Sequence, residues 1–84
     1  MNYLANRIAV DERICNGRPT VRGMGITVAT VLEYLLVGDS KEEILENYSV
    51  LEPADIDACI EFALNTMNHR ITVRPVRAVS RRNT

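Results

Sequence analysis

The chain has 84 residues, of which 46% are hydrophobic and 25% are charged, and its net charge is −1. These values are typical of one globular domain and exclude a disordered or a collagenous chain. A chain of this length buries only about 60 to 65% of the surface that it exposes when unfolded, so its core is marginal and oligomerisation commonly adds stability. We therefore expect a homodimer.

Charge is distributed unevenly along the chain. Residues 1–61 hold all eleven acidic residues and five basic ones, a net charge of −6, whereas residues 62–84 hold five arginines and no acid. The overall charge argues against a general nucleic-acid-binding protein. The basic end is typical of a solvated arm or of a segment that contacts an acidic partner. Its arginines are Arg70, Arg74, Arg77, Arg81 and Arg82.

Cysteine usage and hydropathy indicate the compartment. Cys15 and Cys59 are far apart, and neither a Cys-x-x-Cys pair nor histidines at metal-ligand spacing accompany them, so no metal site is expected. The chain has no secretory signal pattern and no run of about 18 apolar residues. We expect a cytoplasmic protein without a membrane span, with both thiols reduced.

The first third of the chain is predicted to hold a short β-hairpin. Residues 1–6 show no hydrophobic pattern and are expected to be frayed. Ile8–Val10 and residues 20–22 are the predicted strands, and Asn16-Gly17 is a dipeptide typical of the turns that close hairpins. The residues that shape the turns of this region are Gly17, Pro19, Gly23 and Gly25.

Two short helices are predicted next. Thr27 is a good N-cap for a helix over residues 28–37, and Gly38 is its C-terminal stop. Ser40 and Glu43 form a capping box at the start of a helix over residues 41–48. The apolar stripe of the first of these helices comprises Val28, Val31, Leu32, Leu35 and Leu36.

A third helix is predicted from Pro53 to about His69, because proline suits the first helical position. Residues 71–74 alternate like a strand, which Pro75 interrupts. The sequence thus predicts a mainly α fold: one tri-helical domain over residues 1–69 with helix-turn-helix character and a short N-terminal β-hairpin, then a basic, partly extended tail over residues 70–84. The apolar stripe of the third helix comprises Ile56, Cys59, Ile60, Ala63, Leu64 and Met67.

The Gly23-Met24-Gly25 segment precedes a helix, where backbone N–H groups attract anions. A dinucleotide fingerprint would need glycine where Val28 stands, and a phosphate loop would need Gly-Lys followed by serine or threonine. We therefore interpret the segment as a structural turn. A nucleotide-binding enzyme is the weaker alternative.

The other candidates for catalysis are few. His69 is the single histidine, at the predicted end of the third helix, where it suits a cap better than a catalytic base. Cys15 or Cys59 would need that histidine nearby to act as a nucleophile, and no motif supports such a pair. Cys59 is expected in the core. We predict no catalytic residue, no cofactor and no enzymatic activity.

The helix-turn-helix prediction raises the question of DNA binding. Both candidate recognition helices open with acidic residues, at 42 and 43 in one and at 55 and 57 in the other, and these would repel phosphates. We interpret these acidic residues as helix caps or as solvent-exposed residues that aid solubility. The predicted DNA contacts are instead the arginines around the hairpin, unless these only solvate it. They are Arg7, Arg13, Arg18 and Arg22.

Several motifs follow one another in a specific order. They are Arg7-Ile8, Gly-Arg-Pro-Thr-Val-Arg-Gly at residues 17–23, Ile-Thr-Val at residues 26–28, Ser-Lys-Glu-Glu-Ile-Leu-Glu-Asn-Tyr at residues 40–48, and Leu51. Over about residues 7–63 the chain resembles domain-of-unknown-function family 433. It departs from the family pattern at Met24-Gly25, where the family has Thr-Arg, and at Ser49-Val50, where the family has a proline.

The resemblance implies a homeodomain-like tri-helical fold and an antitoxin encoded beside a PIN-like ribonuclease toxin. It implies that the C-terminal segment wraps the toxin, with Arg74, Arg77, Arg81 and Arg82 suited to a carboxylate-lined active site, while the dimeric N-terminal part binds operator DNA. The prediction is therefore a non-enzymatic, antitoxin-like regulator. The alternative is a dimeric protein-interaction scaffold that binds no DNA.

Overall fold

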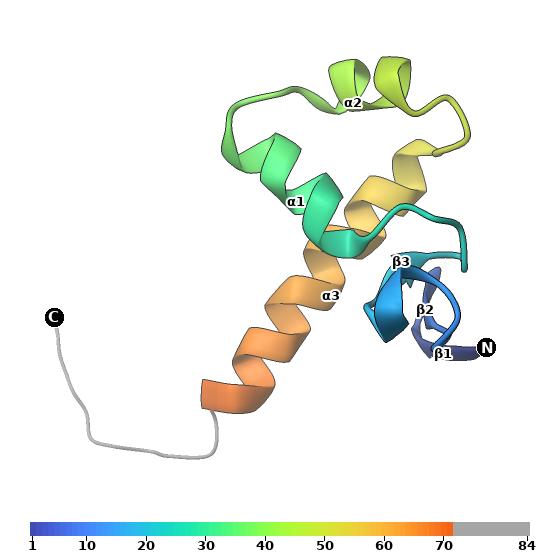
Figure 1. Ribbon diagram of the computed structural model, residues 1–84. Helices are drawn as coiled ribbons and strands as arrows, with labels where there is room; N and C mark the ends of the chain where they lie inside the picture. The colour runs from blue at the N-terminus through green and yellow to red at the C-terminus, as the bar shows by residue number, and fades with distance from the viewer. Residues whose placement is uncertain (72–84) are drawn as a thin grey trace, which may run out of the picture.

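The computed structural model describes the backbone of residues 1–71 and the side chains of residues 1–68 (Figure 1). The fold is mainly helical, with a small antiparallel sheet at the N-terminal end, as the sequence predicts in outline. The elements in chain order are β1 (Asn2–Ala5), β2 (Ile8–Val10), the 3-10 turn η1 (Cys15–Gly17), β3 (Thr20–Val21), α1 (Val28–Leu36), α2 (Lys41–Asn47) and α3 (Pro53–Ile71).

The sheet has three strands in the order β1-β2-β3. The predicted pairing of β2 with β3 is confirmed: Ile8 lies opposite Val21 and Ala9 opposite Thr20. The prediction that residues 1–6 are frayed is wrong, because β1 pairs antiparallel with β2. All four residues of β1 are exposed, so the strand carries no apolar periodicity that the sequence could reveal.

The connection between β2 and β3 is longer than a two-residue hairpin turn. It contains η1, in which Cys15, Asn16 and Gly17 all have left-handed backbones, with φ of 52°, 57° and 79°. The Asn16-Gly17 dipeptide thus supplies the backbone geometry expected of it, but inside a wider loop. Glycine and asparagine tolerate this region at low steric cost, which explains why this dipeptide stands here.

The two short helices have the predicted starts. Thr27 caps α1, its Oγ1 accepting a hydrogen bond from the Thr30 N–H at 3.0 Å. The capping box of α2 is complete, because the Glu43 N–H donates to Ser40 Oγ at 3.1 Å and the Ser40 N–H donates to Glu43 Oε1 at 2.7 Å. Gly38, with φ of 103°, follows the end of α1. Each of these two helices ends one residue earlier than predicted.

Helix α3 is longer than predicted, because Arg70 and Ile71 continue it. The expectation of a strand beginning at residue 71 is therefore wrong at that position. The predicted tail over residues 70–84 therefore does not begin at Arg70, which belongs to α3. The rest of that tail, including Arg74, Arg77, Arg81 and Arg82, lies outside the described residues.

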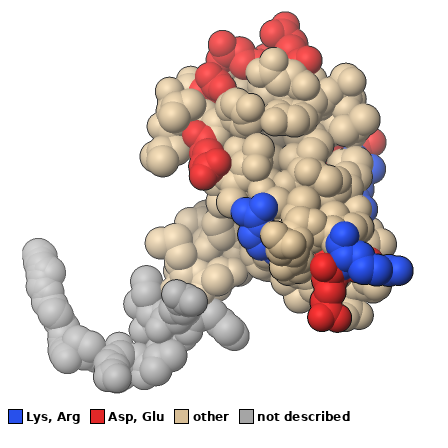
Figure 2. All heavy atoms as spheres, viewed as in Figure 1, with Lys and Arg blue, Asp and Glu red and all other residues tan. Residues whose placement is uncertain are grey.

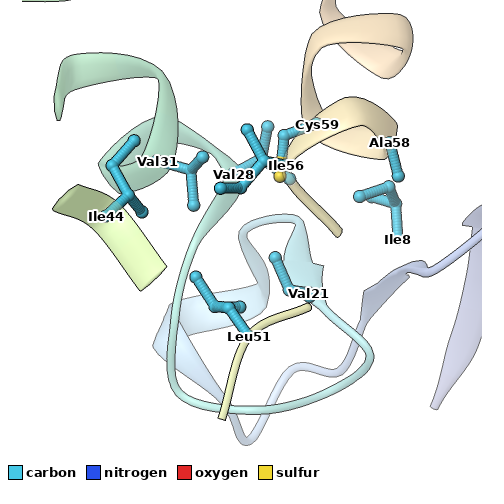
Figure 3. Packing of buried hydrophobic residues seen from close by; sticks show 9 residues of the cluster. All are labelled: Ile8, Val21, Val28, Val31, Ile44, Leu51, Ile56, Ala58 and Cys59. Carbon is cyan, nitrogen blue, oxygen red and sulfur yellow. The ribbon is translucent and has the colours of Figure 1, made fainter. Parts of the chain in front are cut away.

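The core joins one face of the sheet to all three helices (Figure 3). Two predicted stripes are only partly buried: Leu36 at the end of α1 is 84% exposed, and Leu64 and Met67 on α3 are more than half exposed. The buried cluster comprises Ile8, Val21, Val28, Val31, Ile44, Leu51, Ile56, Ala58 and Cys59.

Candidate functional site

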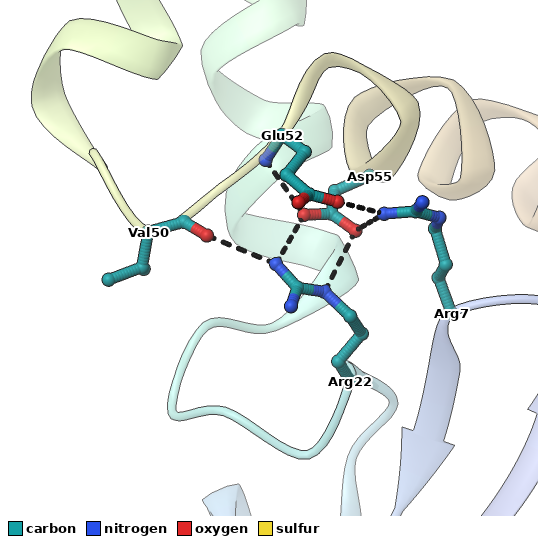
Figure 4. Close-up of polar contacts among 5 residues, drawn as sticks. All are labelled: Arg7, Arg22, Val50, Glu52 and Asp55. Carbon is teal, nitrogen blue, oxygen red and sulfur yellow. Dashed lines mark hydrogen bonds and ion pairs between the residues drawn. The ribbon is translucent and has the colours of Figure 1, made fainter.

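A fully buried carboxylate lies where the sheet meets α3. Asp55, in the first turn of α3, has no solvent exposure. Arg22 reaches it with both ends of its guanidinium, Nε to Oδ1 at 3.1 Å and Nη2 to Oδ2 at 2.8 Å, and Arg7 donates from Nη1 to Oδ1 at 2.8 Å (Figure 4). The Glu52 N–H adds a bond to Oδ2 at 2.8 Å. Four hydrogen bonds therefore satisfy one carboxylate.

Two left-handed turns aim the arginines at Asp55. Arg7 lies in the β1–β2 turn with φ of 66°, and Arg22 follows β3 with φ of 52°. The Arg22 N–H donates to the Arg7 carbonyl at 2.8 Å, so the two turns are tied to each other. Left-handed backbone is unfavourable for a residue with a side chain. The ion pairs with Asp55 help to hold both residues in this conformation.

The edge of this cluster is open to solvent. Arg7 Nη1 also contacts Glu52 Oε1 at 2.6 Å, and Arg22 Nη2 donates to the Val50 carbonyl at 3.0 Å. Glu52 itself is exposed, and the two arginines are partly exposed. The two positive and two negative charges balance, so this cluster joins the sheet to α3 without leaving a net charge.

The arginines determine the ionisation of Asp55. Burial by itself would raise the pKa of this carboxyl, but the hydrogen bonds from Arg22 and Arg7, together with the Glu52 N–H, outweigh it. The pKa of Asp55 is therefore below its usual value. The same bonds raise the pKa of both arginines, so all three groups stay charged at neutral pH.

The four arginines predicted to contact DNA have different surroundings. Arg7 and Arg22 are brought together, but on Asp55. Arg13 and Arg18 lie in the β2–β3 connection: Arg13 is exposed and pairs with Asp11, Nη2 to Oδ2 at 2.9 Å, and Arg18 is exposed with its Nε on the Cys15 carbonyl at 3.2 Å.

The sequence interpretation missed Asp55 as the centre of a buried ion cluster, because it assigned this residue to the solvated start of a helix. The partners lie 33 and 48 positions away in the sequence. No local motif marks such a contact. The one available signal was the pair of arginines beside turns, at residues 7 and 22, whose role depended on the sheet that brings them to α3.

The predicted structural turn is well defined at Gly17 and Gly23, which have φ of 79° and 75°. Gly25 does not have a left-handed backbone, and a β-carbon there would meet nothing within 4 Å. The Pro19 carbonyl accepts a hydrogen bond from the Val28 N–H at 3.0 Å, which ties the turn to the start of α1. The Met1 side chain lies directly over Gly23.

A second candidate site is an apolar groove of about 330 Å³ between α1 and α3. Leu64 and Met67, on the half of α3 that extends beyond the core, are 54% and 56% exposed. Met67 lines the groove, and Leu64 lies three residues before Met67 on the same helix. We call the groove together with these two side chains the α3 surface. The groove is lined by Arg18, Pro19, Thr27, Val28, Ala29, Leu32, Phe62, Ala63, Thr66 and Met67.

The thiols do not form a reactive pair in the part of the chain that is described. Cys59 is buried in the core, as predicted, and burial raises the pKa of its thiol to about 11. Cys15 is half-buried and free. Among the described side chains, those of residues 1–68, no three histidine, cysteine or acidic residues come together in a way that could hold a metal ion. The side chain of His69 lies outside the described set.

None of the described helices is long and apolar enough to cross a membrane.

These features define a small, mainly helical domain with an N-terminal antiparallel sheet and a helical extension. The family model DUF433, described as a protein of unknown function, matches residues 8–63, more than half of the chain. The chain therefore belongs to the DUF433 family. Asp55 and Arg22 lie within the match, whereas β1 and Arg7 precede it and the distal part of α3 follows it. Neither the curated proteins nor the solved structures that were compared gave a match.

Proposed function

We propose that this protein is a non-enzymatic, antitoxin-like regulator. It holds a partner protein through the α3 surface and the basic segment that follows α3. The observation that carries this proposal is the exposure of Leu64 and Met67 on a helix that extends away from the domain (Figure 1). Apolar side chains gathered beside a groove are typical of a surface that another protein covers.

The groove supports a protein partner of a particular shape. Its walls are two helices, and the small side chains of Ala29 and Ala63 leave room between them for an apolar anchor. Arg18 stands at its rim as a charged contact. A groove of this kind takes an amphipathic helix or an extended segment of a partner, in the way that helices commonly dock.

Charge supports an acidic partner. Beyond Glu61 the chain has five arginines and no acidic residue. Complementary charge accelerates association and orients the two proteins, while the apolar contacts supply most of the affinity. A ribonuclease of the PIN type, whose active site gathers carboxylates, is the partner that the family resemblance suggests. On the same basis, α1 to α3 are proposed to have the homeodomain-like helix-turn-helix arrangement.

Co-expression with the product of the neighbouring reading frame tests this proposal. The full chain is compared with a chain ending at residue 71 and with the double variant Leu64→Lys, Met67→Lys. Both changes are expected to weaken capture of the partner by at least about tenfold, because loss of one desolvated contact region costs at least 1.4 kcal/mol. Leu36→Lys is the matched control, since this exposed leucine lies at the far end of α1.

Three results would overturn the proposal. The first is that the neighbouring product fails to co-purify with the full chain. The second is that the truncated chain and the double variant both bind this product as tightly as the full chain does. The third is that Leu36→Lys weakens binding as much as the double variant does. Cell growth provides the second measurement. If the neighbouring product inhibits growth, the full chain is expected to relieve that inhibition and the double variant is not.

Operator binding is the second candidate activity, because Arg13 and Arg18 expose their side chains on one loop. Acidic side chains gather over the α2 end of the molecule (Figure 2), so any DNA would be expected at the sheet end. A gel-shift titration with the upstream DNA at two salt concentrations checks this. Affinity that falls steeply with salt and is reduced in Arg13→Ser, Arg18→Ser supports it. No shift at low salt favours the DNA-free scaffold.

A further inference from the structure

The two edges of the sheet differ in how their backbone groups are used. At the β3 edge, the Val21 N–H donates to the Ile26 carbonyl at 3.0 Å and Thr20 bridges to Thr27. The segment leading into α1 therefore covers this edge. At the other edge stands β1, whose only strand partner within residues 1–71 is β2. The outer side of β1 is thus an open strand edge.

All side chains of β1 are exposed. Tyr3 is 57% exposed, and Leu4, which lies where the register against β2 shifts between Tyr3 and Ala5, is 51% exposed. A strand whose side chains are all exposed gains little from the monomer's core. Residues 1–6 contain no charged side chain and no proline, two of the devices that keep an edge strand from pairing with another chain. The strand is short, however, and its pairing with β2 contains this register shift.

We propose that β1 pairs antiparallel with β1 of a second copy of this chain, which joins the two sheets into one across a twofold axis. Such a contact places the Tyr3–Leu4 segment of one copy beside the same segment of the other. Charged side chains on β1 would repel their own copies in this arrangement, and there are none. An acidic or basic partner would find no counter-charge on this strand, so the second copy is the occupant that fits best.

This interface leaves the α3 surface free. The N-terminus and the sheet lie at one end of the molecule, and the distal half of α3 extends toward the other (Figure 1). A dimer formed through β1 can therefore bind one partner at each α3 surface. The inference does not depend on the proposed function, because self-association is measured on the protein alone.

Sedimentation of the purified chain tests this proposal over a concentration range of about 5 to 500 µM. A contact based on a four-residue strand is expected to be small, and interfaces that bury less than about 1,200 Å² are typical of weak, reversible association. Leu4→Lys is expected to weaken the dimer by at least about tenfold, because a lysine on each copy is brought against the other. Leu36→Lys, at an exposed leucine on α1, is expected to leave the dimer unchanged.

Cross-linking locates the interface. Tyr3→Cys in a Cys15→Ser background is expected to form a covalent dimer with a short thiol-specific linker, because twofold pairing brings the two copies of position 3 close together. Met67→Cys in the same background is expected to form no covalent dimer. Circular dichroism checks that each variant is folded. A chain that stays monomeric up to about 500 µM overturns the proposal. So does a dimer that cross-links through position 67 and not position 3, or one that Leu4→Lys leaves intact.

Discussion

Asp55 shows how much one residue can contribute when it is both charged and buried. Its carboxylate has no solvent exposure and receives hydrogen bonds from two arginines that belong to turns of the sheet. Two buried or partly buried charges stabilise a fold only when each remains paired. Asp55 therefore connects the sheet to the start of α3 through side chains, in addition to the apolar core.

Asp55→Asn is expected to lower the free energy of unfolding by about 3 kcal/mol, at the low end of the range for breaking a buried pair, because the arginines keep some access to water. Urea denaturation at one fixed protein concentration measures this. Glu52→Gln is the control: it removes an exposed carboxylate from the same Arg7, and it should change stability little. Equal losses in both variants would contradict a dominant role for Asp55.

The pKa of Asp55 makes part of this stability depend on pH. Because the folded pKa is lower than the unfolded value of about 3.9, this contribution is complete above that value and is lost as the pH falls through it toward the folded pKa. The stability difference between the natural chain and Asp55→Asn should therefore shrink below about pH 4. Urea midpoints measured from pH 6 to pH 3 check this. A difference that stays constant would show that the carboxylate charge contributes nothing.

Gly23 and Gly25 form a matched pair for testing backbone strain. Gly23 has φ of 75° and lies under the Met1 side chain, whereas Gly25 has neither constraint. Gly23→Ala is expected to destabilise the fold by about 1 kcal/mol or more, and Gly25→Ala to be neutral or slightly stabilising because it reduces the entropy of the unfolded chain. Thermal denaturation of both variants compares them. Similar melting temperatures would contradict the assignment.

At the scale of the elements, local signals set where the helices begin. Thr27 caps α1 and the Ser40–Glu43 capping box starts α2, and both bonds lie within three residues in the sequence. Such contacts form whatever the tertiary surroundings, so the sequence predicts them well. The ends of helices depend more on packing. Helix α3 continues to Ile71, beyond the residue where the sequence suggested that it ends.

Ser40→Ala is expected to lower the free energy of unfolding by about 1 kcal/mol, because it leaves an N–H group of α2 without its cap. Ser49→Ala, at an exposed turn position after α2, serves as the control and should have almost no effect. Chemical denaturation of both variants, with the slope compared as well as the midpoint, provides the measurement. An equal effect at residue 49 would contradict the capping assignment.

The molecule as a whole has different surfaces at its two ends. The sheet end offers an open strand edge without charge, and the α3 end offers exposed apolar side chains followed in the sequence by arginines. Acidic side chains gather over α2, at the top of the view in Figure 2. This separation allows self-association and partner binding to occur on different surfaces, so the two can be tested independently.

Amide hydrogen exchange should divide α3 into two parts. Residues 56–60 pack into the core, and Ile56 and Cys59 are fully buried, whereas residues 64–68 are exposed. Slow exchange requires many buried contacts, so we expect strong protection over the first segment and weak protection over the second. Binding of a partner at the α3 surface should raise protection in residues 64–68. Uniform protection along α3 in the free protein would contradict this description.

Features that depend on neighbouring residues could be predicted from the sequence. It indicated the family, three helices in the right places, the caps of α1 and α2, the pairing of β2 with β3, and the burial of Cys59. The family was indicated by a resemblance of ordered motifs over about residues 7–63, and the other features follow from a hydrophobic period, a cap or a turn dipeptide within a few residues. Such signals act before any distant contact is made.

The three-dimensional fold sets the remaining features, because these depend on residues that lie far apart in the sequence. It placed Arg7 and Arg22 on Asp55, where the sequence suggested free arginines and a solvated carboxylate. It ordered β1 through backbone hydrogen bonds, which carry no side-chain pattern, and it left Leu64 and Met67 uncovered although their spacing predicted burial. Burial and charge pairing depend on what lies opposite a side chain, and one-dimensional spacing does not contain that information.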